Sequence, residues 1–251
     1  MAETNRKTFS MLENNPDVIN TFAARIGLSP ELSFHEVWSF DDPDLLGLIP
    51  RPVYALLVIM PFTPSWHERR EAEDKDMDDY AGSGPGEPVV WFKQIIGHAC
   101  GSIGALHCLI NGEALDHLQP GSTAEKLRKD AIPLKMEKRA QMLHDSQEFE
   151  DVHRSVEMQG SSVVPTRSEQ DRLGQHFVTF VKGKDGHLWE LEGSRKGPLD
   201  RGKLEADEDV LSPRALDLGI RGVIEKEVSS GGSDLRFSCL ALCNTKNPMA
   251  V

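Results

Sequence analysis

A cysteine with a glutamine six residues before it is the first candidate for chemistry in this sequence. Cys100 and Gln94 lie in residues 92–107, which read FKQIIGHACGSIGALH, and a helix is predicted to begin at the cysteine. A thiol in the first turn of a helix faces unpaired N–H groups and the positive end of the helix dipole, which favour the thiolate. Gln94 could donate its amide to an oxyanion beside the Cys100 N–H. An inert, buried cysteine is the alternative interpretation.

The partners of a nucleophilic cysteine are supplied by a predicted β-hairpin. His176 opens a strand over residues 176–181, and an Asp-Gly turn leads into a second strand that ends at Glu192. Antiparallel pairing brings Glu192 back towards His176. A histidine in this position can take the thiol proton while the carboxylate orients its ring. Taken singly, His176 is one of nine histidines, and Glu192 would be interpreted as a solvated residue at the end of a strand. Together with Cys100 they predict a triad.

The sequence resembles the ubiquitin C-terminal hydrolases, which are thiol proteases that cut amides and esters at the C-terminal glycine of ubiquitin. The resemblance runs almost end to end and rests on residues 11–16, 48–57, 94–107, 176–193, 196–199 and 236–242. It implies a papain-like α/β (α+β) fold. In that fold a central antiparallel β-sheet is flanked by helices, and a crossover loop passes over the active site.

The resemblance also implies roles for individual residues. Cys100 would be the nucleophile, His176 the general base and acid, Gln94 the oxyanion donor and Glu192 the group that orients His176. The family usually has aspartate where this chain has Glu192, which is one methylene longer. A reduced rate, or a ubiquitin-binding protein of low activity, is therefore one alternative. A hydrolase for a ubiquitin-like modifier such as NEDD8 is the other. His98 stands where the family often has asparagine, with no chemistry assigned to it.

Composition places limits on the partners. The 251 residues, 39% of them hydrophobic, predict a single catalytic domain over residues 1–251. The net charge of -12 argues against nucleic acid or an anionic membrane surface and is compatible with a basic partner, such as the tail of ubiquitin. A monomer is expected.

The sequence also bears on localisation. The first seven residues lack the apolar core of a signal peptide, and no run is long enough to span a bilayer. We therefore expect a cytoplasmic protein, with the nucleus as an alternative.

The four cysteines show no CxxC pair, which predicts reduced thiols rather than a disulfide framework. Cys239 and Cys243 lie on the same face of a predicted terminal strand, too few ligands for a metal site. His107 and Cys108 are predicted to be packing residues. The expected chemistry uses no metal and no organic cofactor.

Further patterns predict the elements around these residues. Asn15 and Gly27 bracket a helix, residues 34–40 form a strand, and the apolar residues 54–60 form a central strand covered on both faces. Pro133 divides residues 122–144 into two surface helices. The charged, glycine-rich residues 68–86 predict an exposed loop. Residues 146–172 lack periodicity, and the resemblance makes them the crossover loop; disorder without a gating role is the alternative.

Overall fold

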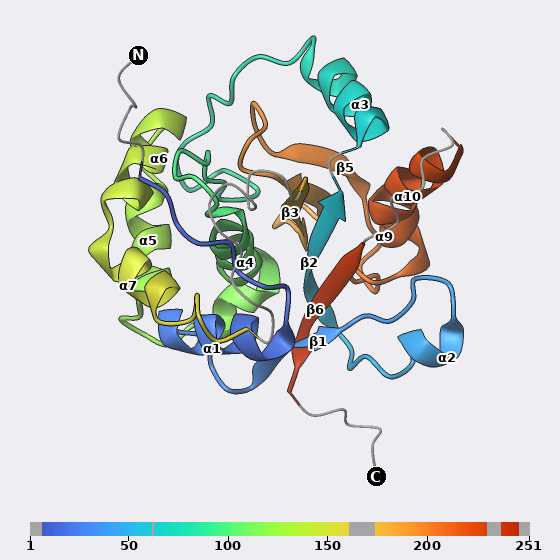
Figure 1. The fold of residues 1–251 in the computed structure, drawn as a ribbon, viewed down its shortest axis with the longest axis horizontal. Coiled ribbons are helices and arrows are strands. Elements are labelled where there is room, and N and C mark those ends of the chain that lie inside the picture. The colour runs from blue at the N-terminus through green and yellow to red at the C-terminus, as the bar shows by residue number, and fades with distance from the viewer. Residues whose placement is uncertain (1–6, 62, 161–173, 230–236, 246–251) are drawn as a thin grey trace.

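A six-stranded antiparallel sheet divides the protein into two layers of helices (Figure 1). The computed structural model describes residues 7–61, 63–160, 174–229 and 237–245. The strand order is β1-β6-β2-β3-β4-β5, so the C-terminal strand lies between the first two. The strands are β1 (Leu32–Glu36), β2 (Val53–Pro61), β3 (Gln175–Lys182), β4 (His187–Leu191), β5 (Leu199–Lys203) and β6 (Ser238–Asn244).

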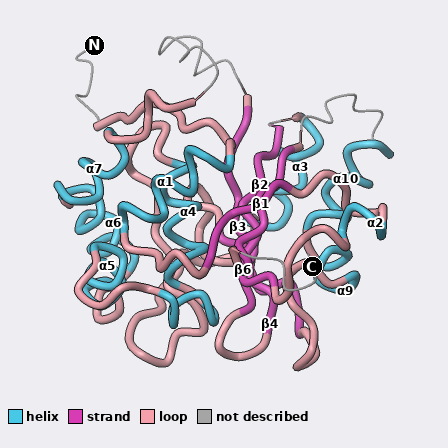
Figure 2. The backbone as a smooth tube through the Cα atoms, turned by 90° about the horizontal axis from the view of Figure 1, so that it is seen from below, coloured by secondary structure: helices cyan, strands magenta, loops and turns pink. Residues whose placement is uncertain are grey.

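The helices form two groups, one on each face of the sheet, as Figure 2 also shows. One face is covered by α1 (Pro16–Ile26), α4 (Cys100–Ile110), η1 (Gly112–His117), α5 (Thr123–Ala131), α6 (Met136–Asp145) and α7 (Gln147–Arg154). On the other side lie α2 (Pro43–Leu46), α3 (Pro64–Asp74), α9 (Pro213–Leu218) and α10 (Ile220–Ser229). Each face has its own buried hydrophobic cluster. The predicted antiparallel sheet flanked by helices is confirmed.

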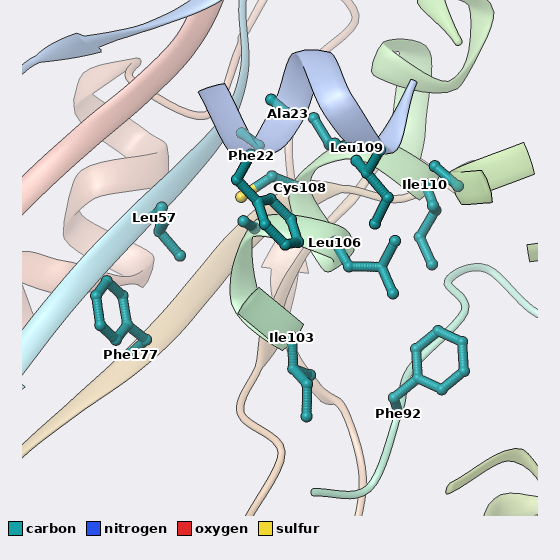
Figure 3. Packing of buried hydrophobic residues seen from close by; sticks show 14 of the residues in the cluster. Phe22, Ala23, Leu57, Phe92, Ile103, Leu106, Cys108, Leu109, Ile110 and Phe177 are labelled. Carbon is teal, nitrogen blue, oxygen red and sulfur yellow. The ribbon is translucent and has the colours of Figure 1, made fainter. Parts of the chain in front are cut away.

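Helix α4 is the centre of the larger cluster, because all eleven of its residues are buried. Figure 3 shows Leu109 of this helix beside Phe22 of α1, Leu106 and Ile103 below them, and Leu57 and Phe177 of the sheet to one side. A helix that is apolar all round must be covered on every side. Here α1, the sheet and the loop before α4 provide that cover.

Glycine allows α4 to approach the sheet closely. A Cβ atom on Gly104 would lie 2.8 Å from Cδ1 of Leu57 and 3.2 Å from Oγ1 of Thr179. The Thr179 hydroxyl uses this proximity to donate a hydrogen bond of 2.9 Å to the Gly104 carbonyl. A side chain of β3 is therefore bonded directly to the helix backbone at this point.

Several elements match their sequence signals. Helix α1 begins with the Asn15 side chain accepting a hydrogen bond from the Asp17 N–H and ends at Gly27, whose φ of 122° suits only glycine. Strand β2 is central and almost wholly buried, as its apolar run predicts. The two helices on either side of Pro133 are α5 and α6.

The predicted hairpin is also confirmed. Strands β3 and β4 pair with Thr179 opposite Leu191, and Gly186 occupies the left-handed region at φ 79° in the turn. The Asp185 carboxylate accepts a hydrogen bond of 3.1 Å from the His187 N–H, which tightens the turn.

Three expectations about loops and ends are wrong. The stretch 68–86 is not all loop, because its first residues belong to helix α3, whose Glu73 side chain pairs with Arg195 in the turn after β4 and with Arg201 on β5. Helix α7 occupies the start of the expected crossover loop because Phe149 and His153 are buried there. Residues 155–160 follow the helix as turns, and the remaining residues of that loop, 161–172, lie outside the described residues. Strand β1 was expected to reach residue 40 but ends at Glu36, because its pairing with β6 ends there.

The four cysteines are free and buried. Cys239 and Cys243 face the smaller hydrophobic cluster together, as their spacing predicts. Within the described ranges, no helix has the length and apolar character that a membrane span requires.

The close approach at Gly104 can be tested by Gly104→Val. The added side chain must displace Leu57 or Thr179, so we expect the free energy of unfolding to fall by about 2–3 kcal/mol. Urea denaturation measures this. Gly86→Val is the matched control because a Cβ there meets nothing within 4 Å, and equal losses in the two variants would contradict the packing argument.

Candidate active site

Cys100 is the first residue of the buried helix α4 and lies beside His176 and Phe177 at the start of β3. Among the described residues no side chain caps this helix end, which leaves its first N–H groups available to other acceptors. The backbone N–H groups of Gly101 and Phe177 donate hydrogen bonds to the Cys100 sulfur. The residue as a whole is 7% exposed. This environment favours a sulfur anion over a neutral thiol.

His176 lies near the start of β3, opposite Met60 on β2, and is buried beside the thiol. A hydrogen bond joins its ring to the Cys100 sulfur. Its Nε2 atom lies 3.0 Å from Oε1 of Glu192. Because Nε2 is occupied by the carboxylate, we infer that Nδ1 faces the sulfur.

Glu192 follows the last residue of β4 and is only 1% exposed. The backbone N–H of Ser194 donates to its Oε1 atom at 3.2 Å, and the Ser194 hydroxyl donates to the same oxygen. Nη1 of Arg70, on helix α3, lies 3.9 Å from this oxygen. The carboxylate is thus held by several donors in addition to His176. This arrangement brings together three of the four residues that the sequence predicts for the site.

Burial and charge act against each other on all three groups. Burial opposes the charged form of His176, but the Cys100 sulfur and Glu192 more than offset it and raise the His176 pKa to about 10. Burial would likewise raise the Cys100 pKa, but the charge and hydrogen bond of His176 bring it below its usual value. Burial also acts to raise the Glu192 pKa, yet His176, Arg70 and Ser194 lower it to about 2. An imidazolium and a carboxylate are therefore the favoured states of His176 and Glu192 at neutral pH, and together they make the Cys100 thiol easier to ionise than an ordinary thiol.

Gln94 lies in an extended segment that runs past the turn after Glu192. Its backbone N–H donates to the Gly193 carbonyl at 2.7 Å, and a Cβ on Gly193 would lie 2.8 Å from the Gln94 Cβ. Its Nε2 atom donates to the Ile96 carbonyl at 3.1 Å. Its buried Oε1 atom accepts no hydrogen bond within the described residues. An amide NH2 has two donors, so one N–H remains for another acceptor.

Two polar side chains of the α4 region hold this segment in place. Nε2 of His107 accepts a hydrogen bond of 2.9 Å from the Phe92 N–H, and Asn111 bonds to both the N–H and the carbonyl of Val90. Burial and the charge of Arg139 lower the His107 pKa to about 3, so His107 stays a neutral acceptor. The prediction that His107 is a packing residue is confirmed, with a specific hydrogen bond added.

His98 supports the turn that leads into the nucleophile. Its φ of 55° is in the left-handed region, which asparagine and histidine adopt more readily than most residues. This backbone requirement accounts for the choice of residue without any chemical role.

A buried ion pair also holds the extended segment before α4, through Glu87 and Trp91. Arg139 on α6 is fully buried, and its Nη2 lies 2.7 Å from Oε2 of Glu87. Its Nη1 donates to the Trp91 carbonyl at 3.2 Å, and Tyr80 donates to Glu87 at 2.8 Å.

The sequence analysis missed Arg139, Ser194 and Arg70, because a single charged or hydroxyl residue among many carries no signal of its partner.

Comparison with known proteins identifies the family of this site. A family model described as "Ubiquitin carboxyl-terminal hydrolase, family 1" matches residues 9–225. The chain belongs to the ubiquitin carboxyl-terminal hydrolase family. It is 30% identical over 242 residues to a probable ubiquitin carboxyl-terminal hydrolase of Dictyostelium discoideum, covering 96% of this chain and 90% of that protein. It is 31% identical to ubiquitin carboxyl-terminal hydrolase 3 of Arabidopsis thaliana, covering 94% of each chain.

Solved structures agree on the fold. The catalytic domain of Trichinella spiralis UCH37, solved with ubiquitin vinyl methyl ester bound, superposes with a TM-score of 0.70 at 21% identity. The superposition covers 95% of this chain and 96% of that one. The predicted papain-like ubiquitin C-terminal hydrolase fold is confirmed.

The charge state of Cys100 can be measured by alkylation with iodoacetamide as a function of pH. We expect a wild-type midpoint below the ordinary thiol value of 9.0. In His176→Gln the cation is lost and burial remains, so the midpoint should rise above 9 and the rate at pH 7 should fall by at least about tenfold. Burial raises the pKa of Cys108 and Cys243 to about 12, so they should react little. Cys100→Ala measures that background, and equal midpoints in wild type and His176→Gln would refute the ion pair.

The buried ion pair predicts a loss of stability when one partner is removed. Arg139→Met leaves the Glu87 carboxylate buried without its cation, so we expect the free energy of unfolding to fall by about 3–5 kcal/mol. Adding Glu87→Gln should recover part of this loss because the charge is gone. Arg154→Met breaks an exposed pair with Glu150 and should cost no more than about 0.5 kcal/mol. Thermodynamic stability measured by chemical denaturation checks all three, and an Arg139→Met loss as small as the control would exclude this anchoring role.

Proposed function

We propose that this chain is a deubiquitinating thiol hydrolase that cleaves amide, ester or thioester adducts at the C-terminal glycine of ubiquitin. The contact between Cys100, His176 and Glu192 carries the proposal. It occurs in a chain that matches the hydrolase family over residues 9–225. The chemistry that this contact supports needs no metal or organic cofactor.

The first half of the reaction forms a thioester. The Cys100 thiolate attacks the carbonyl carbon of the terminal glycine, and the carbonyl becomes an oxyanion. The second N–H of the Gln94 amide and the backbone N–H of Cys100 supply the donors for that oxyanion. His176 then gives its proton to the leaving amine as the carbon–nitrogen bond breaks.

The second half of the reaction releases the modifier. After the amine leaves, neutral His176 takes a proton from water, and the resulting hydroxide attacks the thioester carbon. The carbon–sulfur bond breaks, Cys100 returns to the thiolate and ubiquitin leaves with a free carboxylate. Glu192 keeps the imidazole oriented and stabilises its charged form in both halves.

Glu192 bears on the alternative of a binding protein with low activity. The longer side chain reaches His176, since the two lie 3.0 Å apart, so the departure from aspartate leaves the contact intact. This supports turnover rather than binding alone.

Ubiquitin is the proposed substrate because the relatives are named as its hydrolases and the Trichinella structure holds a ubiquitin ester. The net charge of -12 is compatible with a basic tail entering the site. A ubiquitin-like modifier such as NEDD8 is the second candidate, since it would present a similar terminal glycine to the same three residues.

The direct test is steady-state hydrolysis of ubiquitin that carries a fluorogenic amide at its C-terminus. We expect turnover by the wild type and background rates for Cys100→Ala. Glu192→Asp shortens the acid by one methylene and should pull it away from His176, so we expect kcat to fall at least about tenfold. Glu205→Asp, at an exposed turn, is the matched control and should behave as wild type.

Each other outcome points to a named alternative. A faster Glu192→Asp enzyme would show that the glutamate costs rate. An inactive wild type that binds ubiquitin and gains activity with Glu192→Asp would identify a binding protein. Faster labelling by a probe ending in the NEDD8 glycine than by the ubiquitin probe would identify the ubiquitin-like modifier as the substrate.

A further inference from the structure

Helix α3 is joined to the turn after β4 by a network of ion pairs. Arg195, in the turn, lies 2.9 Å from both Glu73 and Asp74 of the helix. Arg201 on β5 lies 2.8 Å from Glu73 and 2.7 Å from Glu190. The Arg195 side chain is only 4% exposed, so this contact is shielded from solvent. The network fixes the helix beside the segment that carries Glu192.

Arg70 is the residue of this helix that extends to the candidate triad. Its Nη1 lies 3.9 Å from Oε1 of Glu192, and its Nη2 donates to the Ser194 carbonyl at 2.6 Å. Ser194 in turn donates through its N–H and its hydroxyl to the same Glu192 oxygen. Arg70 therefore contacts both the carboxylate and the turn that holds it.

The guanidinium of Arg70 is itself held in place. It lies over the Trp66 ring at 5.3 Å, and its Nε lies 3.7 Å from Oδ2 of Asp74. A planar cation restrained on two sides loses little freedom when it also contacts a carboxylate. Its position is thus set by its own helix before Glu192 is considered.

We propose that Arg70 is a positioning residue that holds Glu192 against His176. Glutamate has one more rotatable bond than the aspartate usual in the family, so its carboxylate needs a further restraint to stay at the imidazole. Arg70 supplies that restraint directly and through Ser194. The inference rests on the proposed function, in which Glu192 orients the catalytic base.

Two other roles for Arg70 predict different results. If Arg70 acted only through its positive charge, it would disfavour the imidazolium form of His176. Removing Arg70 would then stabilise the Cys100–His176 ion pair and lower the pH midpoint of Cys100 alkylation. A purely structural residue would lower the melting temperature without moving that midpoint. A positioning residue predicts the opposite shift, because a carboxylate that leaves His176 destabilises the imidazolium and hence the thiolate.

The test compares Arg70→Met, Arg70→Lys and Arg69→Met. Methionine keeps apolar contact with Trp66 but removes the charge and the donors, and lysine restores the charge. Arg69 is the adjacent residue of the helix and pairs with Glu73, so it is the matched control. The readouts are kcat and KM on the fluorogenic ubiquitin amide, the alkylation midpoint of Cys100 and the melting temperature.

For Arg70→Met we expect kcat to fall about tenfold with KM little changed, and the alkylation midpoint to move upward, in the same direction as in His176→Gln. Arg70→Lys should recover part of both, and Arg69→Met should match the wild type. The proposal would be overturned if Arg70→Met kept the wild-type kcat and alkylation midpoint. It would also be overturned if that midpoint moved downward, or if only the melting temperature fell. If the wild type itself shows no Cys100-dependent hydrolysis, the proposed function fails, while alkylation still reports whether Arg70 acts on the Cys100–His176 pair.

Discussion

The seating of helix α4 against the sheet is the constraint on which the rest of the site depends. This helix has no exposed residue, and Gly104 lets its backbone approach β2 and β3 to within contact of Leu57 and Thr179. Cys100 is on the helix and His176 is on the strand that the helix packs against. The distance between nucleophile and base is therefore set by core packing, which is stiffer than any surface loop. A loop alone would not hold two such groups at hydrogen-bonding distance.

Much of this arrangement could be predicted from local sequence. The cap at Asn15, the turn at Gly186 and the apolar run of β2 each act within a few residues of themselves, so their physical cause is visible in the sequence. The resemblance to a known family supplied what local patterns lack, namely that Cys100 and the hairpin with His176 meet in space.

The elements that escaped prediction depend on distant partners. Helix α3 has a single buried residue, Trp66, and no apolar stripe, so its charges indicate a solvated loop. Its stability comes from ion pairs with arginines more than a hundred positions later, such as Arg195. The roles of Arg139 and Ser194 were equally invisible, because a buried polar residue is understood only when its partner is known.

The position of β6 has a consequence for synthesis of the chain. Strand β6 pairs with β1 on one side and β2 on the other, so residues 238–244 fill the place between the first two strands of the chain. Until that segment leaves the ribosome, β1 and β2 have no neighbour between them and their facing edges remain unpaired. Until then the nascent chain exposes open strand edges, a state in which sheets associate with other chains. Protection by a chaperone is thus most needed before residues 238–244 emerge from the ribosome.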